Sequence, residues 1–193
     1  MSYLDRVLAD SADRANWGRD SFIGASDAAN YAREESIQKY ILAKLKDGRF
    51  QGNAYTEAGH RWEPEILDWF GVPHNTLTFH AQDERGFAAT PDGIEVLPSG
   101  ELMLAEVKVI HGRVHTGPTP AHLRQIWWAQ YVLGARRTKY LWRELVDGVP
   151  RRLEPHIQII ELDDAALAKL LRIARPVLAG VRAAREFERS LAA

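Results

Sequence analysis

The chain has 193 residues, of which 46% are hydrophobic and 26% are charged. This length fits one domain of ordinary size, and this composition is typical of a folded globular protein rather than a disordered or fibrous one. Cysteine is absent, which excludes disulfides and thiolate zinc sites and is compatible with a reducing compartment. The formal net charge of −1 gives no overall sign of nucleic-acid binding.

Neither a signal segment nor a membrane span is apparent. The first sixteen residues carry several charged side chains and no apolar stretch, unlike a secretory signal, and no apolar run approaches the length that spans a bilayer. We therefore expect a cytoplasmic protein without membrane association. The C-terminal segment is rich in arginine, which we interpret as a solvated helix face, with a local basic surface as the alternative. These arginines are Arg172, Arg175, Arg182, Arg185 and Arg189.

Two helices are expected in the first part of the chain. The first should be capped by Ser26 or Asp27, run through regularly spaced apolar residues and end before Gly48. Residues 47–55 are rich in glycine and polar side chains and should form an exposed loop. The second helix should begin at Thr56 as its cap and end before Gly71, with one apolar side.

Between residues 76 and 110 the hydrophobic pattern changes to a period of two, which indicates short strands. We expect four strands in this region, with Pro98-Ser99-Gly100 as the turn before the last of them. The four strands are Leu77–His80, Gly86–Ala89, Ile94–Leu97 and Leu102–Ile110.

A third helix and two more strands are predicted next. Thr119 and Pro120 are typical of a helix start, as cap and first helical residue, and Gly134 should end this helix. Two strands follow, separated by a turn at Asp147-Gly148. They are Lys139–Val146 and His156–Glu161.

Asp163 should cap a long final helix, which Pro176 is expected to kink. The order of the elements predicts an α/β (α+β) protein with a mixed central β-sheet flanked by helices. We expect a single domain over residues 1–193, with a core from about 17 to 162 and a C-terminal helix over 163–189.

Two charged residues stand on one face of the strand predicted at Leu102–Ile110. Side chains alternate along a strand, so Glu106 and Lys108 point the same way as Leu102 and Leu104. Both faces of this strand are otherwise apolar, as expected of an interior strand. Burying a charge costs several kcal/mol unless it has a partner or a metal. Glu106 and Lys108 must therefore pair with each other, with surface charges, or with something that binds there.

Asp92 is the second carboxylate of interest. It stands in Pro91-Asp92-Gly93, a common turn sequence, which by itself predicts only a reversal of the chain. A hairpin after Asp92 would bring it beside the strand of Glu106. Two carboxylates that converge near an ammonium make an oxygen-rich site that suits magnesium or manganese.

Such a site has the groups that phosphodiester hydrolysis requires. Divalent ions held by carboxylates can make a water nucleophilic and stabilise charge on the phosphate and the leaving oxygen. A lysine beside them can orient the attacking water and stabilise developing negative charge. The backbone carbonyl of Val107 would add one more oxygen ligand.

The pair Pro91-Asp92 and Glu106-x-Lys108 resembles the signature of the PD-(D/E)XK nuclease superfamily, whose members share a restriction-endonuclease-like core. Further motifs are similar to those of its lambda exonuclease group, also called YqaJ-like viral recombinases, and they occur in the same order over residues 17–142. These motifs are Ile23-Gly24-Ala25-Ser26-Asp27-Ala28, Gly59-His60-Arg61-Trp62-Glu63-Pro64, Thr90-Pro91-Asp92-Gly93, Leu104-Ala105-Glu106-Val107-Lys108 and His122-x-x-Gln125.

The resemblance implies roles for individual residues. Asp92, Glu106 and the Val107 carbonyl would bind Mg²⁺, with Mn²⁺ as an alternative and two ions per site, and Lys108 would serve the nucleophilic water. Glu63 would support the metal or its waters, although an exposed helix carboxylate is the alternative interpretation. Gln125 would hydrogen-bond near the scissile group, unless it only forms the polar face of a buried helix.

The resemblance also implies a pocket for the 5′-phosphate of a DNA end. In this group an arginine and a serine at the spacing of Arg19 and Ser26 hold that phosphate. A helix N-terminus attracts phosphate through its free N–H groups, but its need for a cap explains Ser26 equally well. Two loop histidines, His111 and His115, are weak indications of zinc.

By resemblance, we expect a Mg²⁺-dependent 5′-to-3′ exonuclease that degrades one strand of linear double-stranded DNA. The 3′ overhangs would serve homologous recombination with a single-strand-annealing protein as partner, and the enzyme would be a ring-shaped homotrimer. The alternatives are a site-specific or structure-specific endonuclease on the same scaffold and a catalytically silent protein that binds DNA ends.

Overall fold

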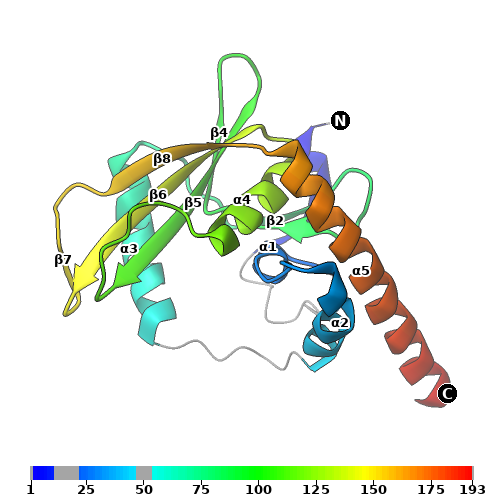
Figure 1. The fold of residues 1–193 in the computed structure, drawn as a ribbon. Coiled ribbons are helices and arrows are strands. Elements are labelled where there is room, and N and C mark those ends of the chain that lie inside the picture. The colour runs from blue at the N-terminus through cyan, green and yellow to red at the C-terminus, as the bar shows by residue number, and fades with distance from the viewer. Residues whose placement is uncertain (1, 11–21, 47–53, 193) are drawn as a thin grey trace.

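The computed structural model describes residues 2–10, 22–46 and 54–192. Its strands form two sheets (Figure 1). The smaller sheet has the order β1 (Val7–Asp10), β2 (Leu77–His80), β3 (Ala88–Ala89), with antiparallel pairs. The larger sheet has the order β4-β5-β6-β7, with β8 also paired to β6. Its strands are β4 (Gly93–Val96), β5 (Leu102–His111), β6 (Arg137–Val146), β7 (Val149–Pro150) and β8 (His156–Glu161).

The larger sheet is mixed, as the sequence predicts. The β5–β6 pair is parallel, whereas the other pairs are antiparallel. The helix α4 (Pro120–Leu133) makes the crossover between the two parallel strands, which is the connection that parallel pairing requires. The α/β class expected from the order of elements is therefore confirmed.

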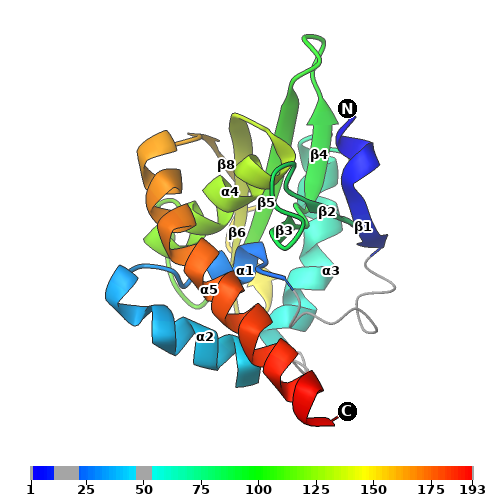
Figure 2. The same ribbon diagram turned by 90° about the vertical axis from the view of Figure 1, so that its right-hand side faces the viewer.

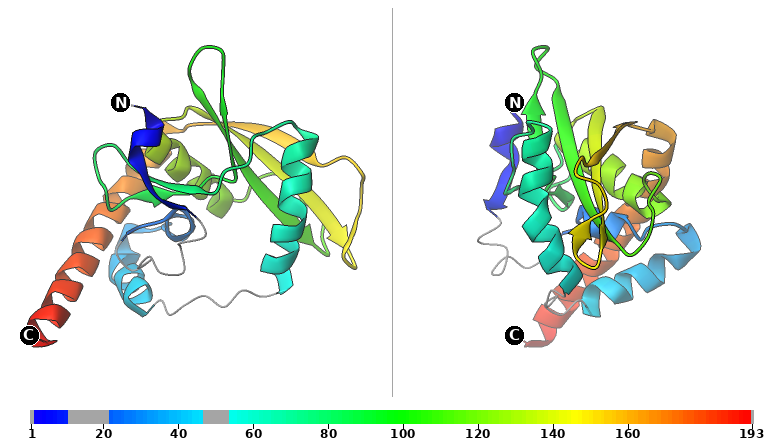
Figure 3. Two further views of the ribbon diagram at one scale, coloured as in Figure 1. Left: turned by 180° about the vertical axis from the view of Figure 1, so that it is seen from behind. Right: turned by 90° about the vertical axis from the view of Figure 1, so that its left-hand side faces the viewer.

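Helices cover both faces of this sheet. The helix α3 (Ala54–Trp69) packs on the face that carries Ala105 and Val107, where Ile66 and Leu67 are fully buried. The helix α4 packs on the opposite face, and α5 (Asp164–Ala192) lies beyond it, as the turned view of Figure 2 and the right panel of Figure 3 show. The largest core cluster lies among α4, α5 and the small sheet, and it includes Trp128 and Phe87, whose ring centroids are 4.9 Å apart.

Helix α4 begins and ends where its sequence predicts. The Thr119 hydroxyl accepts a hydrogen bond from the His122 N–H at 3.2 Å, and Pro120 occupies the first turn. Gly134 ends the helix in the left-handed conformation, with φ of 74°, which glycine adopts without a steric penalty. The Asp163 carboxylate likewise accepts from the Ala166 N–H at the start of α5.

The single helix expected after Ser26 is wrong. The chain instead forms α1 (Ala25–Ala28), a 3-10 turn at Glu34–Ser36 and α2 (Ile37–Lys46). Neither Ser26 nor Asp27 is the N-cap of α1, because Gly24 takes that position and the Asp27 carboxylate accepts from its N–H at 2.8 Å. The break lets α1 pack on α4 while α2 packs on α5.

Other boundaries differ by smaller amounts. Helix α3 begins at Ala54, so Thr56 lies inside it rather than at its cap. Residues 47–53 lie outside the described residues. They include most of the predicted loop and Gly48, before which the first helix was expected to end. The short strands β1 and β7 were not expected, because two to four residues give too little alternation to recognise. Pro176 lies within α5 and does not end it.

Most of the C-terminal arginines form ion pairs on the surface, in agreement with a solvated helix face. Their acidic partners come from other segments of the chain or from α5 itself. The pairs are Arg172–Glu34, Arg175–Asp83, Arg182–Glu84 and Arg185–Glu188. Among the described residues, no helix combines the length and apolar character needed to cross a membrane.

Arg6 joins the small sheet to the end of α4, and its replacement should destabilise the fold. Its buried guanidinium donates to the carbonyl oxygens of Val132 at 2.5 Å and Leu133 at 3.0 Å. Because Arg6→Ala leaves these carbonyls without a partner, we expect a loss of about 2–3 kcal/mol in unfolding free energy, measured by denaturant titration. The exposed pair of Arg172 provides the control, since Arg172→Ala should cost less than about 1 kcal/mol. Equal losses would contradict this assignment.

Candidate metal centre

A hairpin brings Asp92 beside the strand of Glu106. Asp92 directly precedes β4, which pairs with β5 through the turn at Pro98-Ser99-Gly100. The Asp92 N–H donates to the Ala105 carbonyl at 3.1 Å, and its carboxylate Oδ2 accepts from the Val107 N–H at 2.6 Å. The carboxylate therefore lies at the edge of β5, one residue from Glu106.

Gly93 permits this placement for a reason other than the expected one. Its φ lies outside the left-handed region, so it does not serve to reverse the chain. A Cβ at Gly93 would instead lie 2.6 Å from Val72 Cγ1 and 2.9 Å from the Pro73 carbonyl oxygen. Glycine is required because β4 passes close to the segment after α3.

Asn75 fixes the turn that precedes Asp92, and no local sequence pattern indicates this role. The Asn75 side-chain amide donates to the Pro91 carbonyl at 2.8 Å, and its backbone N–H donates to the Asp92 carbonyl at 2.9 Å. A hydroxyl pair between Thr78 and Thr90 at 2.7 Å holds the same segment. Because these contacts join residues 12 to 17 positions apart, local sequence patterns do not reveal them.

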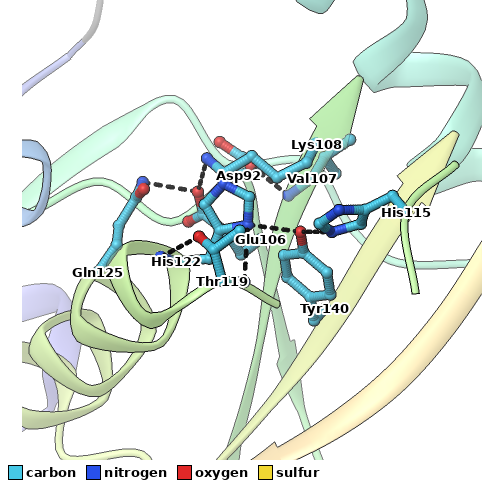
Figure 4. Close-up of polar contacts among 9 residues, drawn as sticks. All are labelled: Asp92, Glu106, Val107, Lys108, His115, Thr119, His122, Gln125 and Tyr140. Carbon is cyan, nitrogen blue, oxygen red and sulfur yellow. Dashed lines mark hydrogen bonds and ion pairs between the residues drawn. The ribbon is translucent and has the colours of Figure 1, made fainter. Parts of the chain in front are cut away.

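Glu106 and Lys108 share a face of β5, as the alternation predicts. The Glu106 carboxylate is buried and accepts from the Lys108 ammonium and from the Gln125 amide, the latter at 2.6 Å (Figure 4). Gln125 lies on α4, the helix that packs on the sheet face opposite α3. The structure therefore brings together Asp92, Glu106, Lys108 and Gln125 from three separate segments.

The electrostatics of the cluster favour a bound cation. Burial raises the pKa of Asp92 well above its usual range, and the charges of Glu106 and Glu63 raise it further, against the opposing effects of Lys108 and the Val107 N–H. Burial acts to lower the pKa of Lys108, but Glu106 and Asp92 outweigh it, so this pKa is raised. Lys108 is therefore charged at neutral pH, while the carboxylates repel each other.

The available oxygen donors fit a hard divalent ion. A strand residue presents its N–H and C=O on the same edge, so the Val107 carbonyl lies on the edge that its N–H shares with Asp92. Among the residues that the structure describes, no three His, Asp or Glu side chains cluster tightly enough to hold a metal by themselves. The candidate donor set is Asp92, Glu106 and this carbonyl, which would leave positions for water or substrate, as magnesium sites usually do.

The remaining predicted site residues are placed less directly. Glu63 lies on α3, the helix that packs on the Val107 face of the sheet, and its charge raises the pKa of both Asp92 and Lys108. Ser26 is exposed on α1, which is tied to α4 by a 2.8 Å hydrogen bond from Arg124 to the Ala29 carbonyl. Arg19 lies outside the described residues.

Comparison with known proteins places this fold among exonucleases. No family model and no curated protein matches the chain. The alkaline exonuclease from Laribacter hongkongensis is 22% identical over 90% of this chain and 94% of its own, with a TM-score of 0.66. The structure of its complex with dAMP is 21% identical over the same shares of both chains, with a TM-score of 0.67. A phage-related exonuclease from Haemophilus somnus 129PT is 12% identical over 80% of this chain and 83% of its own, with a TM-score of 0.56.

These likenesses define the class of the molecule as an α/β protein with an exonuclease-type fold. This fold, a mixed sheet flanked by helices, is similar to the Laribacter structure along 90% of the chain. The resemblance to the lambda exonuclease group, stated above from the motifs, is confirmed at the level of the fold.

Removing the charge of Asp92 should stabilise the metal-free protein. The pKa of Asp92 is raised in the folded protein. Asp92 therefore makes its full contribution to the free energy of unfolding below the unfolded pKa of about 4, and this contribution is lost as the pH rises towards the folded pKa. Asn can still accept from the Val107 N–H but has no proton to lose. In chelator, Asp92→Asn should therefore melt a few degrees above the wild type at pH 8, and the difference should shrink towards pH 4.

Thermal melting at a series of pH values measures this difference. Glu95→Gln is a matched control on the same hairpin, since Glu95 forms a 2.7 Å ion pair with Lys139. This control should melt at or below the wild-type temperature at pH 8. An Asp92→Asn protein that melts below the wild type at pH 8 would contradict the destabilisation of the folded protein by the charged Asp92 carboxylate.

Proposed function

We propose that the chain is a metal-dependent deoxyribonuclease that removes nucleotides from the 5′ end of one strand of linear double-stranded DNA. The observation that carries the proposal is that the Asp92 carboxylate binds the Val107 N–H and interacts with the charge of the adjacent Glu106, while the Lys108 ammonium binds Glu106. The fold shared with exonucleases supports it, and one of these structures contains a bound deoxynucleotide.

Asp92, Glu106 and the Val107 carbonyl are the groups that would hold Mg²⁺ or Mn²⁺, and we propose two ions per site. The metal would supply Lewis acidity for the phosphate and charge stabilisation for the leaving oxygen. Lys108 would orient the attacking water and stabilise the negative charge that develops on the phosphate. Gln125 holds the Glu106 carboxylate in place, and the charge of Glu63 strengthens the attraction of the site for cations.

The biological part of the proposal rests on the motif resemblance. The 3′ overhangs left by the reaction would serve homologous recombination, with a single-strand-annealing protein as partner. The active form would be a homotrimer, and its location would be the cytoplasm.

End-labelled DNA tests the reaction. With Mg²⁺, the protein should release labelled mononucleotides from linear duplex and spare closed circular duplex, and a chelator should stop the reaction. Asp92→Ala should reduce the rate at least about 10³-fold, whereas Glu95→Ala on the same hairpin should cleave at the wild-type rate. Cleavage of the closed circle would favour an endonuclease. Unaltered DNA in both Mg²⁺ and Mn²⁺, with measurable binding to ends, would favour a silent end-binding protein.

The 5′-phosphate pocket has its own test. If Arg19 and Ser26 hold the terminal phosphate, Arg19→Ala and Ser26→Ala should reduce the preference for phosphorylated over hydroxyl ends about tenfold. Initial rates on the two kinds of end measure this preference. Arg33→Ala, in the exposed turn that follows α1, should leave it unchanged. A preference that survives both pocket substitutions would remove these residues from the pocket.

A further inference from the structure

A chain of three polar side chains lies beside the candidate metal centre and is not explained by metal binding. The Tyr140 hydroxyl lies 2.8 Å from His115 Nε2 and 2.7 Å from His122 Nδ1. Tyr140 is on β6, His122 on α4 and His115 in the loop after β5, so three segments meet at one hydroxyl (Figure 4).

One backbone contact indicates the direction of the hydrogen bonds among these three side chains. The Thr119 N–H points at His122 Nδ1 over a long distance of 3.5 Å, which favours a lone pair rather than a proton on this nitrogen. On this assignment the Tyr140 hydroxyl donates to His122 Nδ1 and accepts from His115 Nε2–H. His115 itself is held in place, since its N–H donates to the Glu144 carboxylate at 2.6 Å and its carbonyl accepts from the Trp142 indole at 3.1 Å.

The consequence is one tautomer for His122. Burial is the largest cause that lowers its pKa to about 4, and the positive charge of Lys108 contributes, so the imidazole is neutral at pH 7. With Nδ1 as the acceptor, its single proton is on Nε2, at the opposite side of the ring from Tyr140. His122 is thus an oriented, uncharged N–H donor.

The position of this donor relates it to the candidate centre. His122 precedes Gln125 by three residues on α4, and residues at this spacing share one helix face. Gln125 binds Glu106, and Glu106 is the register partner of Tyr140 on the neighbouring strand. Figure 4 shows the His122 ring between Tyr140 and the group formed by Glu106, Lys108 and Gln125.

We propose that the Nε2–H of His122 hydrogen-bonds a non-bridging oxygen of the substrate phosphate beside Lys108, with Tyr140 and His115 as positioning residues. The proposal rests on the nuclease function proposed above. A neutral donor suits this place because it can stabilise a phosphate oxygen without adding repulsion to the Lys108 ammonium. The competing explanation is purely structural, with the chain acting only as a tie among β6, α4 and the loop.

Two amide substitutions of His122 separate these explanations. An Asn amide reaches the place of Nδ1 and can keep the tie to Tyr140, whereas a Gln amide reaches the place of Nε2 and can supply the missing donor. We expect His122→Asn to lose about 10²-fold in kcat with little change in KM, and His122→Gln to stay within about tenfold of the wild type. Equal kcat values for the two variants, at equal melting temperature, would overturn the proposal.

Tyr140→Phe tests the positioning role without touching the donor. It keeps the ring and removes the nearer of the two groups that contact Nδ1, which leaves only the 3.5 Å contact of the Thr119 N–H. We therefore expect kcat to fall about tenfold, and nitrogen NMR of the imidazole to show a mixture of tautomers. Tyr131→Phe is the matched control, because Tyr131 is on the same helix as His122 but donates to Asp83 at 2.6 Å. A wild-type kcat for Tyr140→Phe would overturn the role of Tyr140.

The same measurements distinguish failure of this inference from failure of the proposed function. If the wild-type protein cleaves no DNA with Mg²⁺ or Mn²⁺, the nuclease function fails and the substrate contact fails with it. If the wild type cleaves and His122→Asn cleaves at the same rate, only the substrate contact is wrong.

Discussion

The candidate site depends on one short hydrogen bond, from the Val107 N–H to the Asp92 carboxylate. Gly93 is the residue at the end of β4 where pairing with β5 stops. At the neighbouring Asp92, the side-chain carboxylate takes the place of a backbone carbonyl as the acceptor for an N–H of β5. It fixes Asp92 next to a residue whose carbonyl shares the same edge and whose neighbour is Glu106. The approach of β4 at Gly93 and the amide contacts of Asn75 serve the same placement. A displaced β4 would separate the two carboxylates.

That placement concentrates negative charge where water has limited access. Asp92, Glu106 and Glu63 all act on the same small region, and Lys108 offsets only part of their charge. Such an arrangement lowers the stability of the folded chain in order to bind something positive, which is typical of sites that serve chemistry rather than folding. The polar chain of Tyr140 and the two histidines adds donors to the same region without adding charge, because burial keeps both imidazoles neutral.

Local patterns predicted the elements that local interactions define. Helix α4 could be placed from its Thr119-Pro120 start and its Gly134 end, and β5 from its alternation, which also put Glu106 and Lys108 on one face. The division into two sheets could not be predicted, because it depends on how the Pro91-Asp92 segment passes from β3 to β4. The separation of α1 from α2 was missed because it follows from packing on two different helices. Tyr140 and His122 were missed as a pair because their contact joins residues 18 positions apart.

Helix α4 is both the crossover between the parallel strands and the source of two polar side chains that face the site. Its residues advance by about 100° each around the helix axis, so a residue inserted or deleted between His122 and Gln125 would turn one of them away from Glu106. The hairpin tip at residues 98–100 is exposed and has no such constraint. Changes in chain length among homologous proteins should therefore collect at the hairpin tip, while the length of this helix is preserved.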